Sequence, residues 1–322
     1  MAAANDVAQK AKGDVLYTQA EATLNKKSMM SFFTPKGQKF EDAAELFSKA
    51  GNAYKRVSAW QEAGESYAKC GECYLQLGEG NFDCSKAFED AGDAYVHVNP
   101  QEAVNAWRQA IEIYSDNGRW NACGKLQKQI AEIYEKGDDN NDSARSVEDA
   151  ITAYEQAEQF FQSDSRTQLA NQCSEKVALL CAEQGELVKA ASKFQDLTNS
   201  AMEKKLTSFN AKNHVVKAIA CLLAAEDTVA ARSTLDDFMQ KDYAFDGTRE
   251  HVFITGVIEG VENLDLDGFS AACQEYNKIK KIDPWMTSML LKSRRIIQSQ
   301  VEGDDEGAGG DDGGAEEEED LT

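Results

Sequence analysis

The chain has 322 residues, 42% of them hydrophobic, which is enough for one extended repeat array or for two globular domains. Its formal net charge of −22 argues against nucleic-acid binding, because that binding needs surplus cations to displace the counterions of the phosphates. No stretch approaches the ~20 apolar residues that cross a bilayer, and the N-terminus lacks the apolar core of a secretory signal. We therefore expect a cytoplasmic protein.

The first break in the helical pattern is the segment 26–37, KKSMMSFFTPKG, which contains a proline and a glycine and should form a loop. Its apolar side chains are Met29, Met30, Phe32 and Phe33. One interpretation is that the loop folds back as a small satellite core. The other is membrane insertion, with the lysines attracted to anionic headgroups and each phenylalanine contributing about 2 kcal/mol.

A period of about twenty residues is the main feature of the next part of the chain. Six tyrosines recur at intervals of 19 to 21 residues: Tyr54, Tyr74, Tyr95, Tyr114, Tyr134 and Tyr154. Four residues before each stands a small or apolar residue: Ala50, Cys70, Ala91, Ala110, Ile130 and Ala150. Both members of each pair face the same side of a helix, so we interpret them as core. Two such units form a helical hairpin of about 40 residues, which predicts an all-α, right-handed superhelical array of tetratricopeptide-like hairpins.

The predicted breaks between helices contain residues that are typical of helix ends. Asn99-Pro100 and Asp283-Pro284 each place a capping side chain before a proline at the first helical position, and Gly118 and Gly137 follow helical runs as left-handed caps. After about residue 160 the period fades while the helical pattern continues. We expect hairpin repeats over 1–160, continuing repeats and a C-terminal helical bundle over 161–300, and a disordered acidic tail over 301–322.

Nothing in the sequence indicates catalysis, a metal or a cofactor. Phosphate-binding loops, HExxH pairs and GxSxG elbows are absent, and the three histidines (His97, His214 and His251) are far apart. The eight cysteines are scattered, and the one close pair, Cys70 and Cys73, lies in a helical run. We expect these cysteines to be free and buried, and we expect the protein not to be an enzyme.

Two charged features suggest binding surfaces. One is a thin set of cations in an otherwise acidic array: Arg108, Arg119, Lys125, Lys128 and Lys176. On adjacent helices they would suit an acidic, elongated partner, although such residues are more often simply solvated. The other is the C-terminus, where eleven acids and no bases occur from Glu302 to Thr322 and Leu321 follows five consecutive acids. That leucine suggests an anchor for a basic partner, while the alternative is a solubilising tail.

Four stretches carry a family resemblance: SFFTPKGQKFEDAAELFSKAGNAYK, NPQEAVNAWRQAIEIYSDNGRW, AITAYEQAEQFF, and DPWMTSMLLK with the closing DLT. In this order they resemble the soluble NSF attachment proteins, in the alpha/beta (Sec17-like) branch. The resemblance implies hairpins followed by a C-terminal bundle, and an adaptor that binds the four-helix bundle of SNARE complexes. It also implies recruitment of the hexameric AAA ATPase NSF, which supplies the ATP chemistry, at the cytosolic face of membranes. The alternative is a helical-repeat scaffold for another protein complex.

The resemblance also implies roles for individual residues. Phe32 and Phe33 match the membrane-attachment loop of the family. Arg119, Lys125 and Lys176 match cations that face the SNARE complex in the family, while Gln172 stands where the family often has a lysine. Acids that meet the ATPase are matched by Glu226, Glu259 and Glu262, with Asn263 in place of a further acid. Leu321 matches the penultimate leucine that stimulates the ATPase, but here it follows an unusually long glycine-rich and acidic spacer.

Overall fold

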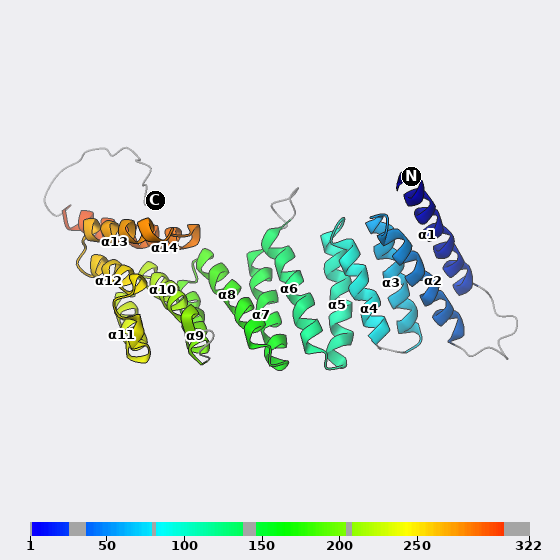
Figure 1. Ribbon diagram of the computed structural model, residues 1–322, viewed down its shortest axis with the longest axis horizontal. Helices are drawn as coiled ribbons and strands as arrows, with labels where there is room; N and C mark the ends of the chain where they lie inside the picture. Colours follow the sequence, from blue (N-terminus) through cyan, green and yellow to red (C-terminus); the bar gives the residue numbers. More distant parts are fainter. Residues whose placement is uncertain (1, 26–36, 79–81, 138–145, 204–207, 306–322) are drawn as a thin grey trace. The chain divides into compact units, whose positions relative to one another are not determined.

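The computed structural model describes residues 2–25, 37–78, 82–137, 146–203 and 208–305 (Figure 1). These ranges contain fourteen α-helices, one short 3-10 helix and no strand, which confirms the all-α class built from helical hairpins. The chain divides into two compact units, residues 1–173 and 174–322. No helix of the described ranges is both long enough and apolar enough to span a bilayer.

The first unit is a row of helices in which the first seven pack consecutively, each against the next (Figure 1). In chain order the helices are α1 Ala2–Asn25, α2 Gln38–Lys55, α3 Trp60–Gln76, α4 Phe82–Tyr95, α5 Pro100–Asp116, α6 Trp120–Lys136, α7 Val147–Ser163 and the first part of α8 Thr167–Glu183. On α2 to α7 apolar residues recur at three- and four-residue spacing, so one face of each of these helices is buried, whereas α1 buries little besides Gly13 and Ala20.

Aromatic rings packed on glycines hold these helices close together. The ring of Tyr67 on α3 lies on Gly51 of α2, so that a Cβ at Gly51 would stand 2.8 Å from Tyr67 Cε1. Trp107 packs on Gly92 in the same way. The small residues predicted to admit the neighbouring helix, such as Ala50 and Ala91, are buried, but the closest ring contacts fall on the glycine one position later.

Four of the six periodic tyrosines are core residues (Tyr54, Tyr95, Tyr114 and Tyr154), whereas Tyr74 and Tyr134 are half-buried. Three of the four buried rings also have hydrogen-bond partners for their hydroxyl groups. The hydroxyl of Tyr54 donates to Asp14 Oδ1 (2.8 Å), and that of Tyr114 donates to Glu89 Oε2 (2.6 Å). Tyr154 donates likewise to Glu135 Oε2 at 2.6 Å. Burial first, and then these hydrogen bonds, raise the pKa of all three phenols. A hydrogen bond at the end of each ring removes the penalty of burying a hydroxyl.

Several consecutive helices are joined by a turn of three or four residues whose penultimate residue is left-handed. In the first unit that residue is Ser58 (φ 55°), Gly118 (φ 65°) or Ser165 (φ 57°). The predicted left-handed cap at Gly118 is confirmed. Gly137 also has a positive φ (73°), but its ψ of −166° places it outside the left-handed helical region, in a more extended conformation that glycine adopts readily. The predicted N-caps are also confirmed, because the side chain of Asn99 accepts from Glu102 N (3.3 Å) and that of Asp283 accepts from Met286 N (2.8 Å).

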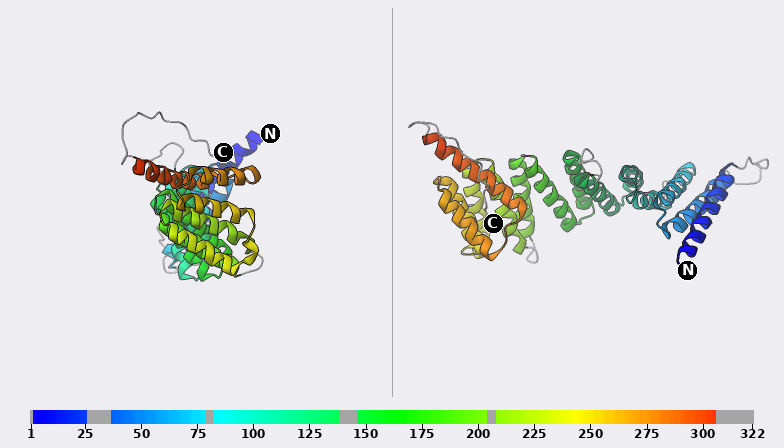
Figure 2. Two further views of the ribbon diagram at one scale, coloured as in Figure 1. Left: turned by 90° about the vertical axis from the view of Figure 1, so that its left-hand side faces the viewer. Right: turned by 90° about the horizontal axis from the view of Figure 1, so that it is seen from above.

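The second unit is a bundle around one helix that is buried on several sides. It contains the rest of α8, then α9 Leu187–Met202, α10 Ser208–Ala224, α11 Thr228–Lys241, the 3-10 helix η2 Tyr243–Phe245, α12 Arg249–Glu262, α13 Leu266–Ile279 and α14 Pro284–Asp305. Helix α10 packs against α9, α11, α12 and α14 (Figures 1 and 2). Its buried side chains are mainly aliphatic, including Val215, Ile219 and Leu223. Helix α14 continues through Asp305, beyond the position at which we expect the acidic tail to begin.

Contacts between residues far apart in the chain hold α14 against α8 in this bundle. The indole Nε1 of Trp285, in the first turn of α14, donates to the carbonyl of Leu179 on α8 at 3.4 Å. The ammonium group of Lys292 lies 3.5 Å from the carbonyl of Ala182, near the end of α8. The last helix of the unit therefore supplies partners to carbonyl groups at the end of its first helix.

All eight cysteines are free and buried, as the sequence predicts. Cys70 and Cys73 both lie within α3, and burial raises the pKa of their thiols to about 12 and about 11. Thiols with such values hold almost no thiolate at neutral pH, so these two residues are core side chains rather than nucleophiles.

Candidate partner-binding surfaces

Two of the predicted cations of the first unit line a hollow of mixed charge. Lys125 and Lys128 of α6 border a space of about 500 Å³ together with Glu89 and Asp93 of α4. Lys128 Nζ also lies 3.8 Å from Glu132 Oε1 on its own helix. The predicted cationic face thus alternates ammonium groups with carboxylates, which favours a partner that presents both charges along its length.

Arg119 lies at the start of α6 beside an exposed aromatic ring. Its guanidinium carbon is 4.8 Å from the centre of the Phe82 ring, and half of Phe82 is exposed to solvent. An arginine over an exposed phenylalanine offers a charge and an apolar face at one place. Phe82 could not be recognised from the sequence, because a single phenylalanine at a helix start gives no periodic signal.

The other predicted cations differ in their surroundings. Arg108 is exposed, and its Nη2 donates to the hydroxyl of Tyr134 at 2.9 Å. On α8, Gln172 is exposed and Lys176 is half-buried. Residues Met29, Met30, Phe32, Phe33 and Leu321 lie outside the described residues, so their predicted roles stay predictions.

An acidic edge forms where α10 and α12 end. Glu226 is the exposed left-handed residue (φ 63°) of the turn between α10 and α11, while Glu259 and Glu262 belong to the last turn of α12. Arg232, early in α11, donates to both carboxylate oxygens of Glu262, at 3.0 and 2.5 Å. This ion pair joins the start of α11 to the end of α12 and thereby brings the predicted acids to the same edge of the bundle.

The acids of this edge are not equivalent. The hydrogen bonds from Arg232 hold the pKa of the Glu262 carboxyl below its ordinary value. Within the described ranges, Glu226 and Glu259 are exposed and take part in no ion pair. Asp227 and Asp265 add negative charge beside them and cap α11 and α13 by accepting from Ala230 N and Gly268 N, each at 2.9 Å. A cationic partner would therefore meet Glu226 and Glu259 as available carboxylates.

The described residues contain no group of three histidine, cysteine or acidic side chains arranged to hold a metal ion. Each histidine has a packing role. His97 stacks on Trp60 with ring centres 4.2 Å apart, and His251 Nδ1 accepts from Gly247 N at 3.1 Å. His214 lies 6.5 Å from the ring of Phe194.

Comparison with known proteins covers both units. A family model described as "Soluble NSF attachment protein, SNAP" matches residues 11–298. The chain belongs to this family. It is 33% identical to the alpha-soluble NSF attachment protein of Vitis vinifera over 84% of this chain and 91% of that one. The corresponding protein of Mus musculus is 33% identical over 89% and 94%. A probable vesicular-fusion protein sec17 homolog of Schizosaccharomyces pombe is 28% identical over 84% and 90%.

Membership of the soluble NSF attachment protein family confirms the resemblance read from the sequence. The matched range contains the cations of α6 and the acidic edge, so both surfaces belong to the part of the chain that is shared with the family. Leu321 lies beyond the matched range.

Proposed function

We propose that this protein is an adaptor that binds SNARE complexes and recruits the ATPase NSF to disassemble them during vesicle fusion and intracellular transport. Family membership over residues 11–298 is the observation that carries the proposal. The adaptor does no chemistry of its own in this proposal, and ATP hydrolysis belongs to NSF.

The proposed roles of the surfaces follow from their charges. Arg119, Lys125 and Lys176 contact the acidic SNARE bundle, and the carboxylates beside Lys125 limit binding to partners with a matching charge pattern. Glu226, Glu259 and Glu262 meet cations of NSF at the acidic edge. Phe32 and Phe33 attach the adaptor to the membrane, and Leu321 stimulates the ATPase.

Disassembly of a fluorescently labelled SNARE complex by NSF tests the proposal. We expect ATP-dependent loss of the complex only when the adaptor is present. Reversing charge at the acidic edge with Glu259→Lys should reduce disassembly about tenfold while SNARE binding is retained, because a desolvated charge pair is lost. The matched control is Asp196→Lys, which changes an exposed acid on α9. Disassembly that is independent of the adaptor, or equal loss in both variants, would contradict the proposal.

The membrane loop is tested by comparing two forms of the substrate. Replacing Phe32 and Phe33 with serine should impair disassembly of SNAREs embedded in liposomes and spare soluble SNAREs. Leu321→Ala should lower stimulation of NSF more than SNARE binding. Equal impairment on both substrates would rule out a membrane role for the loop.

A further inference from the structure

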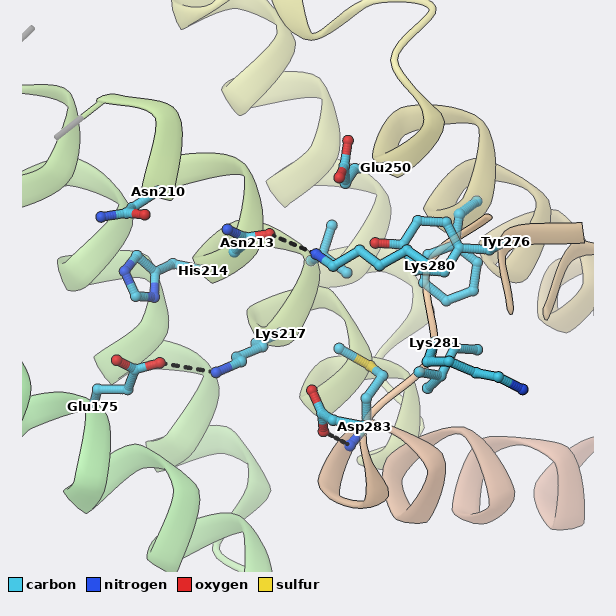
Figure 3. Close-up of a pocket in the computed structure, with 14 residues that line it drawn as sticks. Glu175, Asn210, Asn213, His214, Lys217, Glu250, Tyr276, Lys280, Lys281 and Asp283 are labelled. Atoms are coloured by element: carbon cyan, nitrogen blue, oxygen red, sulfur yellow. Dashed lines mark hydrogen bonds and ion pairs between the residues drawn. The ribbon is translucent and has the colours of Figure 1, made fainter. Parts of the chain in front are cut away.

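The second unit contains a polar hollow (Figure 3). None of the acids Glu226, Glu259 and Glu262 of the acidic edge lines it. It has a volume of about 340 Å³, within the range of small-molecule sites. Helix α10 contributes Asn210, Asn213, His214 and Lys217, and the segment between α13 and α14 contributes Lys280 and Asp283. Phe253, Tyr276 and Met286 supply an apolar wall.

Two of the three carboxylates that line the hollow, Glu250 and Glu175, are already paired with cations. Glu250 is 1% exposed, and it accepts hydrogen bonds from Lys212 Nζ at 3.2 Å and Arg249 Nε at 3.1 Å, two cations that do not line the hollow. Glu175 pairs with Lys217 Nζ at 2.8 Å. Because these acids are neutralised within the fold, they do not cancel the remaining cation on the opposite side.

That cation is Lys280. Its ammonium group reaches across the hollow to Asn213 Oδ1 at 3.3 Å, a neutral partner (Figure 3). The adjacent Lys281 points away from His214 in the same view. An ammonium group has three donors, so Lys280 and Lys217 both retain donors for an incoming anion.

The remaining groups suit hydroxyls. His214 Nδ1 is buried and has no hydrogen-bond partner within the described residues. Burial, above all, lowers the pKa of His214, so the ring is neutral near pH 7 and offers one donor and one acceptor. The amides of Asn210 and Asn213 add further donors and acceptors. Asp283 keeps one carboxylate oxygen beyond the one that caps α14.

We propose that this hollow binds a phosphorylated polyol of the inositol phosphate class, free or as the headgroup of a lipid. Lys280 and Lys217 bind a phosphate group, and Asn210, His214 and Asp283 bind ring hydroxyls. The second carboxylate oxygen of Asp283 accepts a hydrogen bond from a polyol hydroxyl, a donor that inorganic phosphate does not place at this distance from the lysines. The ring of the polyol lies against Tyr276 and Phe253.

Calorimetry on the full chain tests the proposal with inositol trisphosphate, myo-inositol and inorganic phosphate as probes. We expect micromolar binding of the trisphosphate, weaker binding of phosphate and none of myo-inositol. Lys280→Gln should lower the affinity about tenfold, because one hydrogen bond to a charged group is lost. Lys278→Gln is the matched control: it removes the same charge two residues away, from a side chain that pairs with Glu275 outside the hollow.

A vesicle experiment separates the two sources of the ligand. It uses the variant with serine at positions 32 and 33 to remove the proposed loop contact, and vesicles of phosphatidylinositol bisphosphate or phosphatidylserine at equal charge. If the bisphosphate vesicles bind and Lys280→Gln weakens that binding, the ligand is a lipid headgroup. If the free trisphosphate binds and the vesicles do not, the ligand is soluble. Binding of none of the probes, equal binding of both vesicles, or equal losses in the two glutamine variants would overturn the proposal.

Discussion

The two units build their cores in different ways. In the first, rings of one helix lie on glycines of the preceding helix, and the contacts join neighbouring helices. In the second, an aliphatic α10 is surrounded by α9, α11, α12 and α14, and residues about 40 to 110 positions apart are paired, such as Lys212 with Glu250 and Trp285 with Leu179. The first type of core can be repeated hairpin by hairpin, while the second must be completed as a whole.

The largest change in the free energy of unfolding is expected from a substitution that disrupts a ring contact of the first unit. Gly92→Ala places a Cβ against the indole of Trp107 and should lower the free energy of unfolding by about 3 kcal/mol. Urea unfolding measures the loss, and hydrogen exchange should locate it in α4 and α5. In a Trp107→Ala background the same change should cost almost nothing, since the clash is gone. An equally large loss of unfolding free energy in that background would contradict the packing explanation.

The matching test in the second unit removes a buried charge. Glu250→Gln leaves Lys212 without its carboxylate and should lower the free energy of unfolding by about 2 kcal/mol. Burial opposes ionisation of Glu250, but hydrogen bonds from Lys212, its own backbone and Arg249 outweigh burial and hold its pKa below the ordinary value. The stabilisation is therefore present above about pH 4.5 and is lost as the pH falls.

Urea unfolding between pH 3 and 7 measures this dependence, and hydrogen exchange should locate the change in α10 and α12. Glu262→Gln, which breaks a more exposed ion pair, should have a smaller effect. An unchanged acid profile in Glu250→Gln would exclude the carboxylate as its source.

Alkaline pH should distinguish the two units because the buried tyrosines are concentrated in the first. Burial raises the pKa of Tyr67 and Tyr95 to about 12. The unfolded phenols titrate near pH 10, so the stabilisation is complete below about pH 10 and is lost as the pH rises toward 12. Tyr95→Phe should retain about 1 kcal/mol more of its neutral-pH stability at pH 11 than the unmodified protein, measured by urea unfolding. Tyr243→Phe, at an exposed position, should behave like the unmodified protein.

The smallest effect concerns the turn that both units share. Ser58 in the first unit and Leu264 in the second occupy left-handed positions at φ 55° and 53°. Ser58→Gly and Leu264→Gly should each raise the free energy of unfolding by about 0.5 kcal/mol, because relief of backbone strain exceeds the added chain entropy. Thermal unfolding would detect the increase. A stabilisation confined to one unit would show that the turns are not equivalent.

Features that depend on residues close together in the chain could be predicted from the sequence. The twenty-residue period gave the hairpins and the buried tyrosines, and proline with a capping residue gave the starts of α5 and α14. The glycine contacts were missed, because a single glycine within a helical run is indistinguishable from an ordinary interruption until the opposite ring is known. The left-handed Glu226 was missed for a related reason, since glutamate carries no turn signal.

The sequence indicates which charged residues belong to the candidate surfaces, but it does not indicate which residues they pair with. Charges at the acidic edge could be read from the sequence with the help of the family resemblance. The Arg232–Glu262 ion pair joins residues 30 positions apart on different helices, and the carboxylates beside Lys125 come from α4. Such pairings depend on how helices pack, which local patterns do not specify.

The contacts of α14 have a consequence for biosynthesis. Trp285 and Lys292 bind carbonyls at the end of α8, so the second unit lacks these partners until the ribosome has made almost the whole helical part of the chain. The first unit, with contacts between neighbouring helices, can form while translation continues. During that interval the part of α10 that α14 covers stays exposed, and apolar surface of this kind is what chaperones bind.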